Sequence, residues 1–129
     1  MGMPAAKEGD QIVAVDMHMV LVPALPPLLL PHPFAGKLNG ALSSNVKVMG
    51  KPAATVDSTA DNSPAHIPTS PGTAFQTPPA NKGTVKLGSA TVKINGKAAA
   101  RNGDVAETCN DPANLPVGTV VAAGTVMIG

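Results

Sequence analysis

Aromatic side chains are nearly absent from this sequence of 129 residues, which contains two Phe and neither Trp nor Tyr. Large rings therefore cannot dominate the core, which must be built from many small contacts among Val, Ile, Leu and Ala. Charge is also scarce, at 13% of residues with a formal net charge of +1. A nucleic-acid partner is not expected, because phosphate binding needs a dense basic face and single-strand binding needs aromatic stacking platforms.

Cysteine is represented only by Cys109, which excludes an intramolecular disulfide and leaves a free thiol, an intermolecular bridge or a metal ligand. Long apolar runs are missing as well. The stretch at residues 20–30 is interrupted by three prolines and is shorter than the ~20 residues of a membrane helix, so we expect an extended loop there. Acidic residues interrupt the N-terminal segment where a signal peptide would be apolar. We therefore expect a protein made in the cytoplasm without a signal peptide.

The length suits one small domain over residues 1–129, and the 13 Gly and 14 Pro indicate many turns and loops. No segment has the apolar periodicity of a helix. Short alternating runs bounded by Gly, Asn and Pro predict strands instead, at residues 46–48, 85–87, 92–94, 120–121 and 126–128. The five prolines between residues 57 and 83 predict a long loop. The expected fold class is therefore all-β, with long Pro-rich loops and little or no helix.

The sequence also contains an internal repeat. Residues 45–54 match residues 91–100, and residues 4–10 align without gaps to residues 98–104. Each unit has a Val-x-Val/Ile strand, a Gly-Lys turn, an Ala-rich segment and then an acidic residue, which is Asp10, Asp57 or Asp104. The N-terminal unit lacks its leading strand, which residues 125–129 can supply. This pattern predicts three similar faces in a ring, with the last strand pairing with the first, so that exposed sheet edges are removed.

Four side chains are of the kinds that zinc prefers: His18, His32, His66 and Cys109. His18, His66 and Cys109 each follow the acidic residue of a unit by a few positions, so these side chains converge if the three faces converge. His32, which lies between two prolines, can supply the fourth ligand. One thiolate and three imidazoles complete a tetrahedral zinc shell, with iron(II) as the second choice. The alternative interpretation is that they are surface histidines and a buried, inert thiol.

A structural metal fits a small chain that has few aromatics and no disulfide. The competing hypothesis is a small zinc-dependent hydrolase that uses the same site. A catalytic zinc needs an open coordination position and a nearby general base. Here all three His are needed for the ligand shell, and the only Glu residues are Glu8 and Glu107. We therefore expect a protein that is not an enzyme.

The repeated Gly-Lys-(Pro/Ala)-Ala-Ala motif, the Gly-Asp that follows it, and the three His with one Cys resemble the PAAR-repeat family. Members of this family are spike-tip proteins of contractile injection systems, which include type VI secretion systems and phage-tail-like particles. The resemblance covers residues 3–129. The chain departs from the family pattern because none of its three tetrapeptides, at residues 4–7, 52–55 and 98–101, reads Pro-Ala-Ala-Arg. In addition, Asp57 lacks a preceding Gly, and the insert around residues 23–33 is long.

The resemblance implies a short β-cone with pseudo-threefold symmetry and a zinc ion near its apex, held by His18, His32, His66 and Cys109. The broad base would cap a trimeric β-helical spike, with one tip per trimer, and the apex would help to puncture the target envelope. The implied partners are thus the spike protein and, transiently, the target membrane, while an effector remains open as a further partner. On its own the protein would be a monomer. It would act at the tip of the injection machine and be delivered outward.

Overall fold

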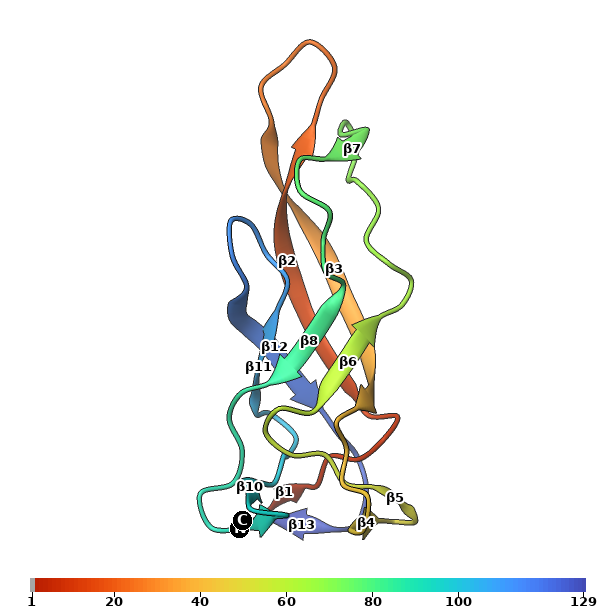
Figure 1. Cartoon of the computed structure of the whole chain (residues 1–129), viewed down its shortest axis with the longest axis vertical. Helices are drawn as coiled ribbons and strands as arrows, with labels where there is room; N and C mark the ends of the chain where they lie inside the picture. The colour runs from red at the N-terminus through yellow and green to blue at the C-terminus, as the bar shows by residue number, and fades with distance from the viewer. Residues whose placement is uncertain (1) are drawn as a thin grey trace.

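The computed structural model describes residues 2–129, and within that range the chain forms strands, turns and loops but no helix. The expected all-β class is therefore confirmed. Figure 1 shows an elongated molecule with a broad base and a narrow upper end. The base carries three two-stranded antiparallel sheets, and the body is a closed barrel.

The three strand pairs of the base share one register; two of them are hairpins, and the third joins the two ends of the chain. They are β4 (Lys47–Val48) with β5 (Lys51–Pro52), β9 (Lys93–Ile94) with β10 (Lys97–Ala98), and β13 (Met127–Ile128) with β1 (Met3–Pro4). The antiparallel pairs Val48↔Lys51, Ile94↔Lys97 and Ile128↔Met3 occupy equivalent positions. The pairing of β13 with β1 confirms that the last strand closes against the first. In the two continuous hairpins both turn residues have positive φ (Met49–Gly50 and Asn95–Gly96), as type I′ turns require.

Backbone hydrogen bonds link the three units in a closed triangle. The Ala6 N–H donates to the Ala100 carbonyl (2.9 Å), the Ala54 N–H to Ala6 (3.0 Å), and the Ala100 N–H to Ala54 (3.0 Å). All three residues are buried in one core cluster. Below them a second cluster contains the equivalent residues Ala5, Ala53 and Ala99, with Val48, Ile94 and Ile128. Only a small side chain allows three backbones to approach so closely, which explains the repeated Ala-Ala pair.

In the middle unit the predicted landmark, Asp57, is not the structural equivalent of Asp10 and Asp104. The turn-closing N–H groups belong to Asp10, Ser58 and Asp104, which donate to the carbonyls of Lys7, Thr55 and Arg101 at 3.0–3.1 Å. Asp57 has a φ of +78° and occupies the place of Gly9 and Gly103, whose φ values are +91° and +90°. Ser58 is therefore the equivalent of Asp10. With this correction, His18 and His66 follow their unit landmarks at the same sequence spacing.

Above the base, six strands close into a barrel in the order β12-β11-β8-β6-β3-β2, with β2 paired to β12. They are β2 (Gln11–Leu21), β3 (Leu28–Gly40), β6 (Thr59–Asn62), β8 (Lys82–Val85), β11 (Val105–Thr108) and β12 (Leu115–Val121). The short strand β7 (Ala74–Phe75) pairs with the upper end of β2. Buried side chains of Ile12, Phe34, Leu38, Val85 and Val120 fill the barrel.

Two segments that were expected to be loops contain strands. The region 57–83 includes β6, β7 and the start of β8. In the stretch 20–30, residues 22–27 with their three prolines do form a loop, and strand is found only at its two ends, in β2 and β3. Prolines are tolerated in upper β3 because Pro31 lies opposite Met17, whose N–H and C=O bond instead to Asn110 and Asp111. The Pro31 nitrogen is thus not needed for the β2–β3 ladder, and β6 pairs only with residues 36–40 of β3.

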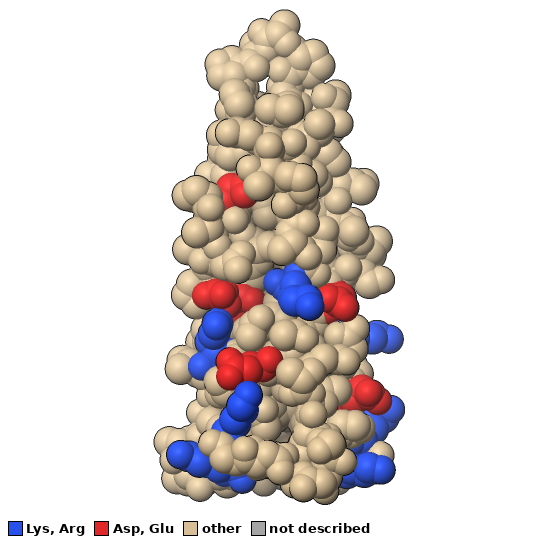
Figure 2. Space-filling model, viewed as in Figure 1, with Lys and Arg blue, Asp and Glu red and all other residues tan. Residues whose placement is uncertain are grey.

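Charged side chains are concentrated in the lower half of the molecule (Figure 2). Neither residues 17–36 nor residues 62–81 contain Asp, Glu, Lys or Arg. The β2–β3 hairpin forms the upper end of the molecule and exposes the side chains of Leu21, Leu25, Leu28 and Leu29. Among the described residues, no helix has the length and apolarity needed to cross a membrane.

Candidate metal centre

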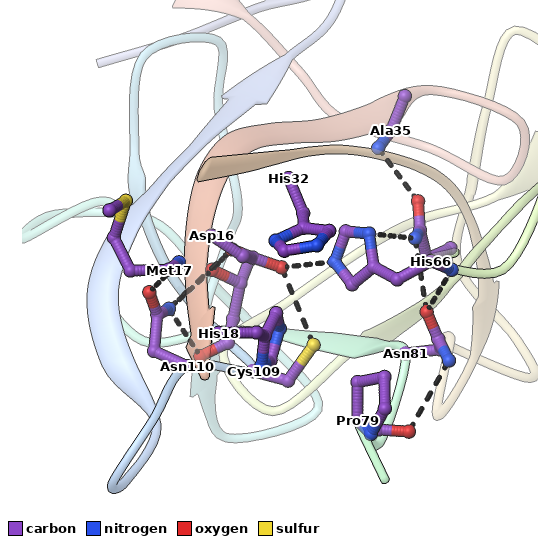
Figure 3. Close-up of polar contacts among 12 residues, drawn as sticks. Asp16, Met17, His18, His32, Ala35, His66, Pro79, Asn81, Cys109 and Asn110 are labelled. Atoms are coloured by element: carbon purple, nitrogen blue, oxygen red, sulfur yellow. Dashed lines mark hydrogen bonds and ion pairs between the residues drawn. The ribbon is translucent and has the colours of Figure 1, made fainter. Parts of the chain in front are cut away.

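The candidate ligands meet inside the upper part of the barrel. Asp16 and His18 lie on β2, His32 lies on β3, His66 follows β6, and Cys109 directly follows β11. Figure 3 shows these side chains gathered around a common space. One donor atom from each of Asp16, His18, His66 and Cys109 lies within 4.8 Å of the others. The structure therefore brings together three of the four predicted ligands and adds a carboxylate.

Asp16 is the residue that the sequence analysis missed, and it is fully buried. Its Oδ2 lies 2.8 Å from His66 Nε2 and accepts a hydrogen bond from the Cys109 thiol at 3.4 Å. Its Oδ1 accepts from the Thr108 hydroxyl and, at 3.5 Å, from Asn110 Nδ2. A usable signal was present, because residues two apart on a strand share a face, which places Asp16 beside His18.

Among the residues that the structure describes, neither ring nitrogen of His18 has a hydrogen-bond partner, although the side chain is 1% exposed. Within residues 2–129 it is paired with one acid, Asp111, whose Oδ2 lies 3.5 Å from His18 Nδ1. Burial lowers the pKa of His18, so its ring is neutral at pH 7. A buried polar group without a partner is costly, and a bound cation would satisfy it. The site thus fits a metal ion.

His66 is positioned by a network of amides. Its Nδ1 lies 3.2 Å from Asn62 Nδ2, and its backbone N–H donates to Asn81 Oδ1 at 2.8 Å. The two amides are joined by a 3.1 Å hydrogen bond from Asn62 to Asn81, and Asn62 Oδ1 accepts from the Ala35 N–H. These contacts hold the imidazole so that Nε2 points toward Asp16 (Figure 3).

His32 lies beside the group but has partners of its own. Its ring centre is 5.5 Å from that of His18 and 5.6 Å from that of His66. Its Nδ1 is 2.9 Å from the Leu30 carbonyl, and its Nε2 accepts from the Thr69 N–H at 3.1 Å. Burial lowers the pKa of His32, so this ring is also neutral at pH 7. Its role as a ligand stays a prediction.

Cys109 is buried, and desolvation raises the pKa of its thiol to about 11. Without a cation the residue is therefore a neutral thiol at pH 7. Metal binding removes the proton, because the thiolate is the form that coordinates. The segment that carries Cys109 is fixed to the edge of β2, since Asn110 Oδ1 accepts from the Met17 N–H at 2.7 Å and the Asp111 N–H donates to the Met17 carbonyl at 2.8 Å.

The cluster thus combines nitrogen, sulfur and oxygen donors and could hold a metal ion. Nothing in this geometry selects one metal, since zinc and iron(II) both accept such donors. No protein-family model matches the chain, and no curated protein matches it either.

Proposed function

We propose that this protein is a PAAR-like spike tip, which caps the trimeric β-helical spike of a contractile injection system and helps it to pierce the target envelope. The proposal is carried by one observation, the pseudo-threefold base. Three two-stranded pairs of identical register surround a closed triangle of backbone hydrogen bonds between alanines. A single chain with such a base can match the end of a threefold partner, so one tip suffices for each trimer.

The tapered body supports the same function. The molecule narrows from the base to the β2–β3 hairpin, and its upper part is almost free of charge (Figures 1 and 2). A tip driven through an envelope bears concentrated force, so it must resist separation of its walls. The uncharged surface also lowers the cost of passing through a lipid layer, because buried charges are the groups that hydrocarbon excludes most strongly.

We propose further that the metal is structural zinc and that the protein is not an enzyme. His18, His66 and Cys109 would hold the ion, together with a fourth side chain from this cluster. They come from β2, from the segment after β6 and from the segment after β11, so the ion would tie three walls together. Zinc binding contributes directly to the free energy of folding. In zinc-finger peptides this contribution is roughly 10–16 kcal/mol, which is the most to expect here.

The metal can be tested by elemental analysis and thermal unfolding of the purified protein. We expect one zinc per chain and a large fall in melting temperature after chelation. Cys109→Ala and His66→Ala should bind no zinc and should have about the melting temperature of the chelated wild type. Asn114→Ala, on the exposed loop between β11 and β12, is the matched control and should behave like the wild type. A melting temperature that is the same with and without metal would refute a structural ion.

The capping role can be tested with the trimeric β-helical spike protein of the same injection system. Native mass spectrometry should detect one tip per spike trimer, and the tip alone should be a monomer. Met127→Glu, at the exposed base, should weaken the complex, whereas Leu25→Glu, at the opposite end, should leave it intact. A stable homotrimer of the tip would contradict the argument from internal symmetry.

A further inference from the structure

We propose that Asp16, through Oδ2, is the fourth ligand of the ion, in place of His32. The inference rests on the proposed metal site and specifies its donor set. It would make that set two imidazoles, one thiolate and one carboxylate: His18, His66, Cys109 and Asp16.

The two oxygens of Asp16 have different surroundings. Oδ1 is held from outside the cluster by the Thr108 hydroxyl and the Asn110 amide. Oδ2 faces His66 Nε2 at 2.8 Å and Cys109 Sγ at 3.4 Å, which are two of the other atoms that would bind the metal. A carboxylate that is fixed through one oxygen and presents the other to the site is arranged as a one-oxygen ligand, and Thr108 and Asn110 orient it from the second shell.

Charge favours a direct bond from Asp16 to the ion. The Asp16 carboxylate is buried beside the site in either donor set, and together with the thiolate it balances a divalent ion. Its attraction to the ion is strongest when Oδ2 itself coordinates. Asp16 itself is 0% exposed and, within residues 2–129, forms an ion pair with neither Lys nor Arg. The metal would thus supply the missing countercharge.

His32 is less free to coordinate than Asp16. Its Nε2 accepts the Thr69 N–H at 3.1 Å, and the Thr69 hydroxyl donates to the Pro31 carbonyl at 2.9 Å. Coordination through Nε2 would remove the acceptor of the Thr69 N–H, and coordination through Nδ1 would break the contact with the Leu30 carbonyl. His32 is better explained as the residue that fastens the segment around Thr69 to β3.

The variants Asp16→Asn and His32→Gln separate the two donor sets. Asn keeps the shape of Asp16 but removes its charge, and Gln can still accept from the Thr69 N–H. Zinc affinity would be measured by competition with a chromophoric chelator, with the exposed Asp61→Asn as the matched carboxylate control. We expect Asp16→Asn to lose about 100-fold or more in affinity, and His32→Gln to lose less than about 10-fold. The reverse order would overturn the inference.

A second measurement needs no variant, which covers the case in which Asp16→Asn fails to fold. X-ray absorption at the zinc edge of the wild-type protein should detect one sulfur and two imidazole rings, with a further oxygen donor. Three imidazole rings around bound zinc would refute the role of Asp16 and leave the metal site standing. Wild-type protein that binds no zinc at all would instead refute the metal site, and the inference with it.

Discussion

Phe34 offers the sharpest test of how the barrel is filled, because it is the more deeply buried of the two phenylalanines. Its side chain is 2% exposed, and Gly83 of β8 leaves space for its ring. A Cβ placed on Gly36 or on Gly83 would come within 3.2 Å of the Phe34 ring. The ring also lies 6.1 Å, centre to centre, from His66. No other large ring lies in this core cluster to take its place.

Replacing Phe34 with Ala should therefore leave a cavity. Substitutions of this kind cost about 3–5 kcal/mol, against a total stability of roughly 5–15 kcal/mol for a typical domain. For a chain of this size we expect the melting temperature to fall by roughly 10–20 °C. The measurement is thermal or urea unfolding in the presence of a chelator, so that metal binding does not mask the loss.

Phe75→Ala is the matched control. Phe75 lies on β7 and is only partly buried, so its removal should cost clearly less in the chelated protein. If Phe34→Ala cost less than about 1 kcal/mol, the barrel could repack around the missing ring. The interpretation of Gly83 as space made for Phe34 would then be wrong.

Three further predictions follow from local features. Asp57→Gly should leave stability unchanged or raise it by up to about 1 kcal/mol in urea unfolding, because Asp57 holds a φ of +78° where the other units have Gly. The substitution also removes an exposed ion pair, in which Lys97 Nζ lies 3.4 Å from Asp57 Oδ2; a clear loss of stability would show that this pair outweighs the strain. In the chelated protein, the free energy of unfolding should fall as the pH drops below about 6.5. Burial lowers the pKa of His18 and His32 in the folded protein, so the unfolded chain binds more protons in that range. A stability that does not change between about pH 7 and pH 5 would contradict this. The same free energy should fall again as the pH rises from 9.0 toward 11, because burial raises the pKa of Cys109 from 9.0 to about 11, and Cys109→Ala should abolish that second loss.

The base was predictable because its three units repeat in sequence. The matches between residues 45–54 and 91–100 correspond to hairpins of the same register, and residues 125–129 supply the strand that the first unit lacks. The strands in Pro-rich segments were harder to predict, since Pro31 is tolerated only because a loop from elsewhere in the chain forms hydrogen bonds with Met17. Local propensity carries no information about such a partner.

The candidate site was only partly predictable, for a related reason. His18 and Cys109 were found by residue type and by their position after a unit landmark. Asp16 was missed because no strand was predicted over residues 11–21 and because Asp is usually solvent-exposed; its burial depends on Thr108 and Asn110 from a distant segment. The landmark of the middle unit was misplaced by one residue because an Asp can adopt the positive φ that normally requires Gly.

A single chain can also do what an exact trimer cannot. The equivalent positions Lys47, Lys93 and Met127 share a backbone register but differ in chemistry, as do Lys51, Lys97 and Met3. Symmetry is thus kept in the backbone, where the three alanine hydrogen bonds impose it, and is lost in the side chains. Three identical subunits would present identical donors to an ion on their axis. One continuous chain can surround the same point with a carboxylate, a thiolate and imidazoles, and can therefore match the charge of a buried divalent ion.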